Sequence, residues 1–228
     1  MRLGTNLAWG DYDGDGDLDL YITNWGSSIS PVVSTNRLYR NNGNGSFSDV
    51  ASSTGVTDTR NSIDAHWADY DNDGNKDLFV TNYGVSKLFR NAGKGQFEHV
   101  PGNAFSDVQA SYRSMGCAWG DFDQDGFVDL VVVRHMDTEE AIDWGPHIFV
   151  DLLDHLVLYH NNGNGFFDDV TTLLGDPLTL RDKMPVGNIW GAGFQPAWVD
   201  FDNDGDCLLY TSDAADDTPC VDLGGRRI

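Results

Sequence analysis

One nine-residue acidic stretch recurs along the chain, and it constrains the fold more than any other feature. Each copy has Asp at positions 1, 3 and 5 and Gly at position 6, and a Trp stands two residues before it. Three complete copies, at residues 11–19, 69–77 and 121–129, also end in Asp, whereas a fourth, at 200–206, breaks off. Short apolar runs such as Leu-Phe-Val at 78–80 follow the complete copies. Because such runs are typical of buried strands, each stretch is predicted to join two strands.

The spacing of these acidic residues fits a calcium site. Ca²⁺ takes six to eight oxygen ligands, and Gly at position 6 allows the sharp turn that wraps a short loop around the ion. Side chains at positions 1, 3, 5 and 9 and the backbone carbonyl at position 7 would surround it. The predicted ligands are Asp11, Asp13, Asp15, Asp17 and Asp19; Asp69, Asp71, Asp73, Asn75 and Asp77; Asp121, Asp123, Asp125, Phe127 and Asp129; and, in the incomplete fourth loop, Asp200, Asp202, Asp204 and Asp206.

Two other interpretations of the acidic stretch are disfavoured. An EF-hand ends in a bidentate Glu at position 12 and lies between helices, whereas position 12 here is Ile22, Val80 or Val132. Ordinary solvated Asp-Gly turns are the alternative to metal loops, but four copies with the same internal spacing favour ligation.

The composition limits the partners of the chain. The net charge is −22, and by direct count Asp makes up 33 of the 36 acidic residues, with 17 of them in the four loops. Such acidity excludes nucleic acid, whose phosphates attract Lys and Arg, and anionic membrane surfaces. No apolar run reaches the 18 residues of a membrane span, so no membrane insertion is expected. No signal peptide is visible, since Met1 runs directly into the first strand, and we expect the natural N-terminus to be missing.

The repeats also share a hairpin, which defines the fold class. Gly-rich turns between alternating apolar residues predict hairpins at residues 37–50, 87–100 and 157–170. Together with the two strands around each acidic loop, they make four strands per repeat, which is the content of a propeller blade. We therefore predict an all-β partial β-propeller of about three and a half four-stranded blades with calcium-binding inter-strand loops. The repeats lie near residues 3–57, 61–110, 113–175 and 190–206, and Leu38, Tyr39, Phe89, Tyr159 and the repeated Trp and Phe positions are expected to form the inter-blade core.

The last residues, 207–228, look foreign to the repeats. Both ends of this segment resemble the translation of sequencing-adaptor DNA, and the join falls inside the fourth acidic loop, so that Leu208 replaces its ninth-position Asp. We expect an adaptor-derived, non-native tail; a natural tail whose Leu-Leu-Tyr-Thr run imitates a strand by chance is the alternative.

Residues 134–156 form an insertion in the third repeat. Insertions on one face of a repeat array often line a binding surface, so this segment is a candidate partner contact, with a neutral decoration as the alternative. His135, His147 and His155 lie in or beside it, with Asp137, Glu139 and Glu140, and are considered as a transition-metal site. All six histidines, which also include His66, His99 and His160, are considered for acid–base work, but none sits in a His/Asp/Ser or His-x-x-His arrangement. His66, which replaces a small residue before a Trp, is expected at the core or rim, and Cys117 is expected to be a small buried apolar residue.

The Asp-x-Asp-x-Asp-Gly-x-x-Asp loops and the Asn-Asn-Gly-x-Gly-x-Phe hairpins at 41–47 and 161–167 resemble the FG-GAP/VCBS repeats of calcium-bound β-propellers. That family includes the integrin α-chain head and bacterial secreted proteins of the ASPIC type. The resemblance covers residues 3–206. The Gly-Ala-Pro side of the integrin motif is absent and is replaced by Thr-Asn at 23–24 and 81–82, which favours the bacterial branch. A complete propeller of this family would have about seven blades, so the resemblance implies a fragment of a longer protein.

Together these features predict a calcium-binding propeller module for recognition or adhesion, without enzymatic activity. Its location would be extracellular, periplasmic or at the cell surface, where calcium sites of about 10⁻⁴–10⁻³ M affinity are useful. The ligand would be an extracellular protein or a glycan. The alternatives are a part of a secreted carbohydrate-active enzyme or a structural spacer.

Overall fold

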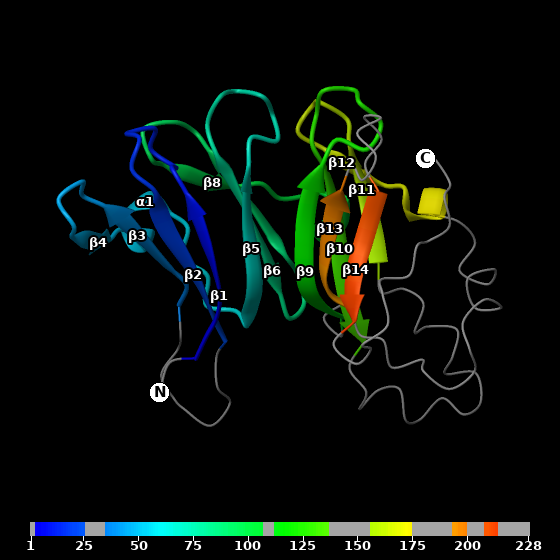
Figure 1. The fold of residues 1–228 in the computed structure, drawn as a ribbon, viewed down its shortest axis with the longest axis horizontal. Coiled ribbons are helices and arrows are strands. Elements are labelled where there is room, and N and C mark those ends of the chain that lie inside the picture. The colour runs from blue at the N-terminus through cyan, green and yellow to red at the C-terminus, as the bar shows by residue number, and fades with distance from the viewer. Residues whose placement is uncertain are drawn as a thin grey trace.

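The chain folds into a series of antiparallel sheets that follow one another in sequence (Figure 1). The computed structural model describes residues 3–25, 35–106, 112–136, 156–174, 193–199 and 208–213. Within these ranges there are three four-stranded sheets and one two-stranded sheet, and each is a simple meander of neighbouring strands. The predicted all-β fold of blade-like repeats is therefore confirmed, with three complete blades and two strands of a fourth.

The strand bounds repeat with the same pattern in each sheet. The first sheet contains β1 (Leu3–Gly10), β2 (Asp19–Trp25), β3 (Arg37–Asn41) and β4 (Phe47–Asp49). The second contains β5 (Ser62–Ala68), β6 (Asp77–Asn82), β7 (Lys87–Asn91) and β8 (Phe97–His99). The third contains β9 (Tyr112–Gly120), β10 (Asp129–Met136), β11 (Leu156–Asn161) and β12 (Phe167–Asp169). The fourth contains β13 (Gly193–Val199) and β14 (Leu208–Asp213).

The acidic stretches join the first two strands of each complete sheet, as predicted. In every sheet the repeated Trp pairs with the Leu that follows the stretch, as Trp9 does with Leu20 and Trp67 with Leu78. The last Asp of each stretch is the first residue of the second strand. The register is therefore the same in all repeats, and each loop connects strands of one blade at the same end.

Short helical segments follow the fourth strand of each complete sheet. They are α1 (Ala51–Thr54), η1 (Ala104–Ser106) and η4 (Thr171–Leu174). The helix α1 ends at Gly55, which has a φ of 89° and therefore takes the left-handed conformation that glycine tolerates. These segments lead from the outer strand of one blade toward the first strand of the next.

Aromatic residues hold adjacent blades together. Trp67 of β5 contacts the first sheet, where its ring stacks on Tyr12 with 6.4 Å between centroids and its Nε1 donates to the Ala8 carbonyl at 3.3 Å. A Cβ on Gly10 would lie only 2.7 Å from Trp67 Cδ1, so glycine is needed for this close approach. In the third and fourth sheets, Gly120 and Trp198 repeat the same contact. The repeated Trp thus packs on the blade that precedes its own.

Most of the expected core residues are buried, and two aromatic positions of the first sheet differ. Leu38, Phe89 and Tyr159 are buried, while Tyr39 is half-buried. Trp9 is 51% exposed and Phe47 46% exposed. In later blades, Trp67 and Phe97 contact Tyr12 of the preceding loop, and Phe167 contacts Tyr70. The described residues place no blade before the first sheet.

Two of the sequence-based expectations fall largely outside the described residues. Of the insertion at 134–156, only the end of β10 and Leu156 of β11 are described. Of the segment 207–228, the structure describes β14, which pairs with β13 in the register of the other blades, so that Leu208 lies opposite Val199. The adaptor origin of that segment stays a prediction. No helix in the described ranges is long and apolar enough to cross a membrane.

Candidate metal centres

Each complete acidic loop gathers three carboxylates into a cluster. In the first loop the cluster contains positions 1, 3 and 5, whereas in the second and third loops it contains positions 1, 3 and 9. Within a cluster the nearest ligand atoms all lie within 4.8 Å of one another. The members are Asp11, Asp13 and Asp15; Asp69, Asp71 and Asp77; and Asp121, Asp123 and Asp129. The spacing in sequence therefore becomes proximity in space, and the donor set consists of carboxylate oxygens, the ligands that Ca²⁺ prefers.

Backbone N–H groups of the loop hold the position-1 carboxylate. Asp69 accepts the N–H of Asp73 at 3.0 Å on Oδ1 and that of Gly74 at 2.9 Å on Oδ2. Asp11 and Asp121 accept equivalent bonds from Gly16 and Gly126. The glycines at position 6 have φ values of 88–92°, which side chains rarely adopt. The conformation of the loop is thus fixed by its own sequence, and it turns the acidic side chains inward.

The position-9 carboxylate is buried and links the loop to the hairpin. Asp19, Asp77 and Asp129 have no exposed surface. Asp77 accepts the Tyr70 N–H at 3.1 Å and the Asn91 N–H at 2.7 Å. The other two make the same pair of bonds. This residue therefore connects the start of its own loop with the end of the third strand.

Burial makes the charged form of this carboxylate costly. It raises the pKa of Asp77 to about 7, and it raises the pKa values of Asp19 and Asp129 to about 6. The neighbouring carboxylates at positions 3 and 5 add to the shift in Asp77. A bound cation would keep these groups ionised, because a nearby positive charge favours the carboxylate form. The buried acid therefore fits a metal site.

A hairpin asparagine ties each later loop to the preceding blade. Asn91 Nδ2 donates to the Tyr12 carbonyl in the first loop at 2.7 Å and to the Lys76 carbonyl in its own loop at 3.1 Å. Asn161 repeats this pattern toward the Tyr70 carbonyl at 2.8 Å. The sequence places these asparagines only within the predicted hairpins. Their recurrence two residues before the first hairpin glycine was the signal for this second role.

Cationic side chains of the third strand face two of the loops. Arg90 of β7 forms ion pairs with Asp71 at 2.5 Å and Asp73 at 2.7 Å. His160 of β11 occupies the equivalent position and lies 2.9 Å from Asp123 and 3.6 Å from Asp125. Arg90 supplies positive charge to positions 3 and 5 of the second loop, and His160 does so in the third loop when it is protonated. In the second loop a metal would share those carboxylates with Arg90.

The remaining predicted ligands are placed as follows. Asp17, Asn75 and Phe127 at position 7 lie beside position 5, because each donates its N–H to the position-5 carboxylate at 2.8–2.9 Å. In the third loop Asp125 clusters with His160 and Asp123. The fourth loop, with Asp200, Asp202, Asp204 and Asp206, lies outside the described residues, and its ligand role stays a prediction.

Comparison with known proteins agrees with this geometry. The FG-GAP-like repeat profile matches residues 11–80 and 69–132, which contain all three complete loops and more than half of the chain. The chain belongs to the FG-GAP-like repeat family. The acidic loops described above are therefore the loops of FG-GAP repeats, and the sequence-based resemblance is confirmed.

Other comparisons add little to the family assignment. No curated protein matches the chain. Among solved structures, an Agrocybe aegerita lectin, described as recognising non-reducing terminal N-acetylglucosamine, is similar with a TM-score of 0.48 and 18% sequence identity. The match covers 92% of this chain and 46% of the lectin chain, so this chain spans less than half of that protein's length.

Proposed function

We propose that this FG-GAP chain is a calcium-stabilised propeller module for extracellular recognition or adhesion, with a protein or glycan as ligand and no catalytic role. The observation that carries the proposal is the carboxylate cluster that recurs in three loops, each of which ends in a fully buried position-9 Asp. A repeated site of this kind supports the scaffold that a binding surface requires.

The donor set favours Ca²⁺ over other divalent ions. The clusters of positions 1, 3, 5 and 9 contain only oxygen donors, which suit Mg²⁺, Ca²⁺ and Mn²⁺ better than softer metals. Mg²⁺ demands near-ideal octahedral geometry and keeps several waters, whereas Ca²⁺ accepts many carboxylates in a flexible arrangement. Four or five carboxylates within nine residues therefore favour the larger ion.

Calcium binding in these loops would also stiffen the contacts between blades. Without an ion the carboxylates repel one another, and binding to a site of this kind is coupled to folding. Because Asn91 joins the second loop to the Tyr12 carbonyl of the first, an ion that orders one loop also restrains its neighbour. This coupling supports a role outside the cell, because calcium is abundant enough there to fill sites with dissociation constants of about 10⁻⁴–10⁻³ M.

The metal part of the proposal is tested by calorimetric titration of the metal-free chain with CaCl₂. We expect at least three sites per chain in the affinity range of extracellular modules, and the variant Asp69→Ala should lose one of them. A matched change of the exposed Asp168 on β12 to Ala should lose none. Heat changes equal to those of the buffer alone would contradict calcium binding.

The recognition part is tested separately with the calcium-saturated chain on glycan and extracellular-protein arrays. A bound ligand whose signal falls when calcium is removed would support the proposal. Silence on both arrays would favour a structural spacer, and turnover of a glycan or ester substrate would overturn the non-catalytic assignment.

A further inference from the structure

Three of the four first strands carry a polar side chain at one equivalent position. Strands β1, β5, β9 and β13 contact one another in this order (Figure 1). In each of these strands, the register of pairing with the second strand of the same blade shifts close to the residue that lies three positions before the repeated Trp. That residue is Asn6 in β1, Asp64 in β5 and Gln195 in β13, whereas β9 has Gly116 there. Because a bulge re-aims side chains and is frequent next to functional sites, this level of the fold is a candidate binding region.

Asp64 is at the centre of a network that joins the first three blades. Its Oδ1 accepts the Asn6 side-chain amide at 2.5 Å and its own neighbour's N–H, from Ala65, at 2.8 Å. Its Oδ2 lies 3.1 Å from His66 Nε2 and accepts the Cys117 N–H at 3.3 Å. Donors from β1, β5 and β9 therefore hold one buried carboxylate in a single orientation.

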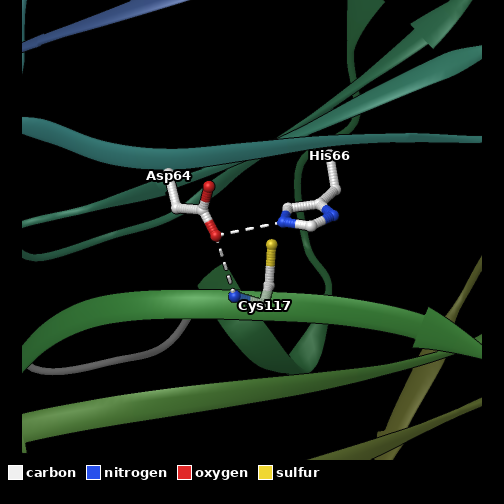
Figure 2. Close-up of side chains that lie close together, drawn as sticks. All are labelled: Asp64, His66 and Cys117. Carbon is white, nitrogen blue, oxygen red and sulfur yellow. Dashed lines mark hydrogen bonds and ion pairs between the residues drawn. The ribbon is translucent and has the colours of Figure 1, made fainter. Parts of the chain in front are cut away.

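His66 and Cys117 add nitrogen and sulfur donors to this carboxylate (Figure 2). The Cys117 thiol is completely buried and points from β9 toward the space between Asp64 and His66 of β5. One donor atom from each residue lies within 4.8 Å of the other two. The other repeats have Ala at the position of His66, namely Ala8, Ala118 and Ala197. The imidazole is thus a departure from the repeat pattern at the place where, among the described residues, a thiol and a buried carboxylate meet.

We propose that Asp64, His66 and Cys117 form a transition-metal site of the zinc class between the second and third blades. A carboxylate, an imidazole and a thiolate are all ligands of Zn²⁺, whereas the loop clusters that we assign to calcium contain no sulfur. A carboxylate and a thiolate together balance the charge of a divalent ion. The site shares no residue with the calcium loops.

The geometry requires only a small closure. With bonds of about 2.0–2.3 Å, the ligand atoms of a tetrahedral zinc site lie roughly 3.3–3.8 Å apart. The donor atoms of the three residues lie within 4.8 Å of one another, so even a pair at that distance would have to approach by only about 1 Å. His66 has 34% of its side chain exposed and can make this movement. Burial, with Asp64 nearby, raises the pKa of the Cys117 thiol well above its usual value, so binding of the metal releases that proton to solvent.

Three protein ligands leave a fourth position for water or a small ligand. A pocket of about 330 Å³ adjoins His66, and its lining includes Asn6, Trp9 and Gln195. Gln195 Nε2 lies 3.4 Å from His66 Nε2, so the first strand of the fourth blade also reaches the site. An exogenous ligand on the metal would therefore enter from this side and contact strands of three blades.

Titration with Co²⁺ tests the site, because a cobalt–thiolate bond gives a near-ultraviolet charge-transfer band that carboxylate sites lack. The chain would carry Cys207→Ser and Cys220→Ser so that Cys117 is its one thiol, and calcium would be kept in excess. We expect one equivalent of Co²⁺ to produce the band and Zn²⁺ to remove it by competition. Cys117→Ser should abolish the band.

The ligand roles of the other two residues are tested with changes that other repeats already contain. His66→Ala introduces the residue of the equivalent positions, and Asp64→Asn introduces that of Asn6, so both variants should fold, as circular dichroism would verify. Each should weaken Co²⁺ binding at least about tenfold, since losing even a hydrogen-bond partner of a ligand costs that much. The exposed His99, changed to Ala, serves as the matched control. Absence of the band, or a band of unchanged affinity in His66→Ala, would overturn the proposal.

Discussion

Replacing Asp77 with Ala tests both roles of the position-9 carboxylate. Its two oxygens accept the backbone N–H groups of Asn91 and Tyr70, and all of these groups are in the buried part of the second blade. Each buried donor left without a partner costs about 1–3 kcal/mol, so the variant should lose about 2–6 kcal/mol of unfolding free energy even without metal. Asp77→Asn, which keeps the shape and one acceptor oxygen, should lose less.

The metal-binding role of Asp77 adds a second, calcium-dependent loss. At a calcium concentration ten times the dissociation constant, one site stabilises the folded chain by about 1.4 kcal/mol. The gain in unfolding free energy on adding calcium should therefore shrink by about that amount in Asp77→Ala. Urea unfolding in metal-free and calcium-saturated buffers separates the two losses, and Asp168→Ala, at an exposed position of β12, is the control. An undiminished calcium gain in Asp77→Ala would show that the residue holds the backbone without ligating metal.

Three further predictions follow from the same contacts. Burial raises the pKa of Asp77 to about 7 from its unfolded value of about 3.9, so the metal-free chain should lose stability as pH rises between these values. The calcium-induced shift in melting temperature should therefore grow from pH 5 to pH 8, and a pH-independent shift would refute this. Gly10→Ala should cost about 1–3 kcal/mol because its Cβ would lie 2.7 Å from Trp67 Cδ1; an unchanged urea midpoint would argue against the tight packing. Asn91→Ala removes the bond to the Tyr12 carbonyl and a bond within its own loop, and should cost about 1–3 kcal/mol in urea unfolding; a loss within experimental error would contradict the link between blades.

The local features of the repeats were predictable from the sequence. The order of Asp and Gly at 69–77 specifies a tight acidic loop, because short carboxylates accept nearby backbone N–H groups and the glycine supplies the positive φ. The apolar run that begins at Leu78 specifies a buried strand after it. These properties depend on residues within a few positions of one another, which is the range over which spacing is informative.

Contacts between repeats were beyond this range. The bond from Asn91 to Tyr12 joins residues 79 apart, and the meeting of Asp64 with Cys117 depends on how two blades pack. From the sequence, Cys117 was expected to be buried and His66 to lie at the core or rim. Both expectations agree with the structure, but neither placed the two side chains together. The bulge that aims Asp64 inward is a tertiary feature without a local signal in its own strand.

The melting temperature of the chain in saturating calcium and in excess chelator is the most direct test of calcium as the structural ion of these loops. Three sites at about 1.4 kcal/mol each would stabilise the fold by about 4 kcal/mol, which raises the melting temperature of a chain of this size by about 8–16 °C. Magnesium at the same concentration should give a much smaller increase, because its geometry suits these loops less well. Melting curves that superimpose in calcium and in chelator would contradict the assignment.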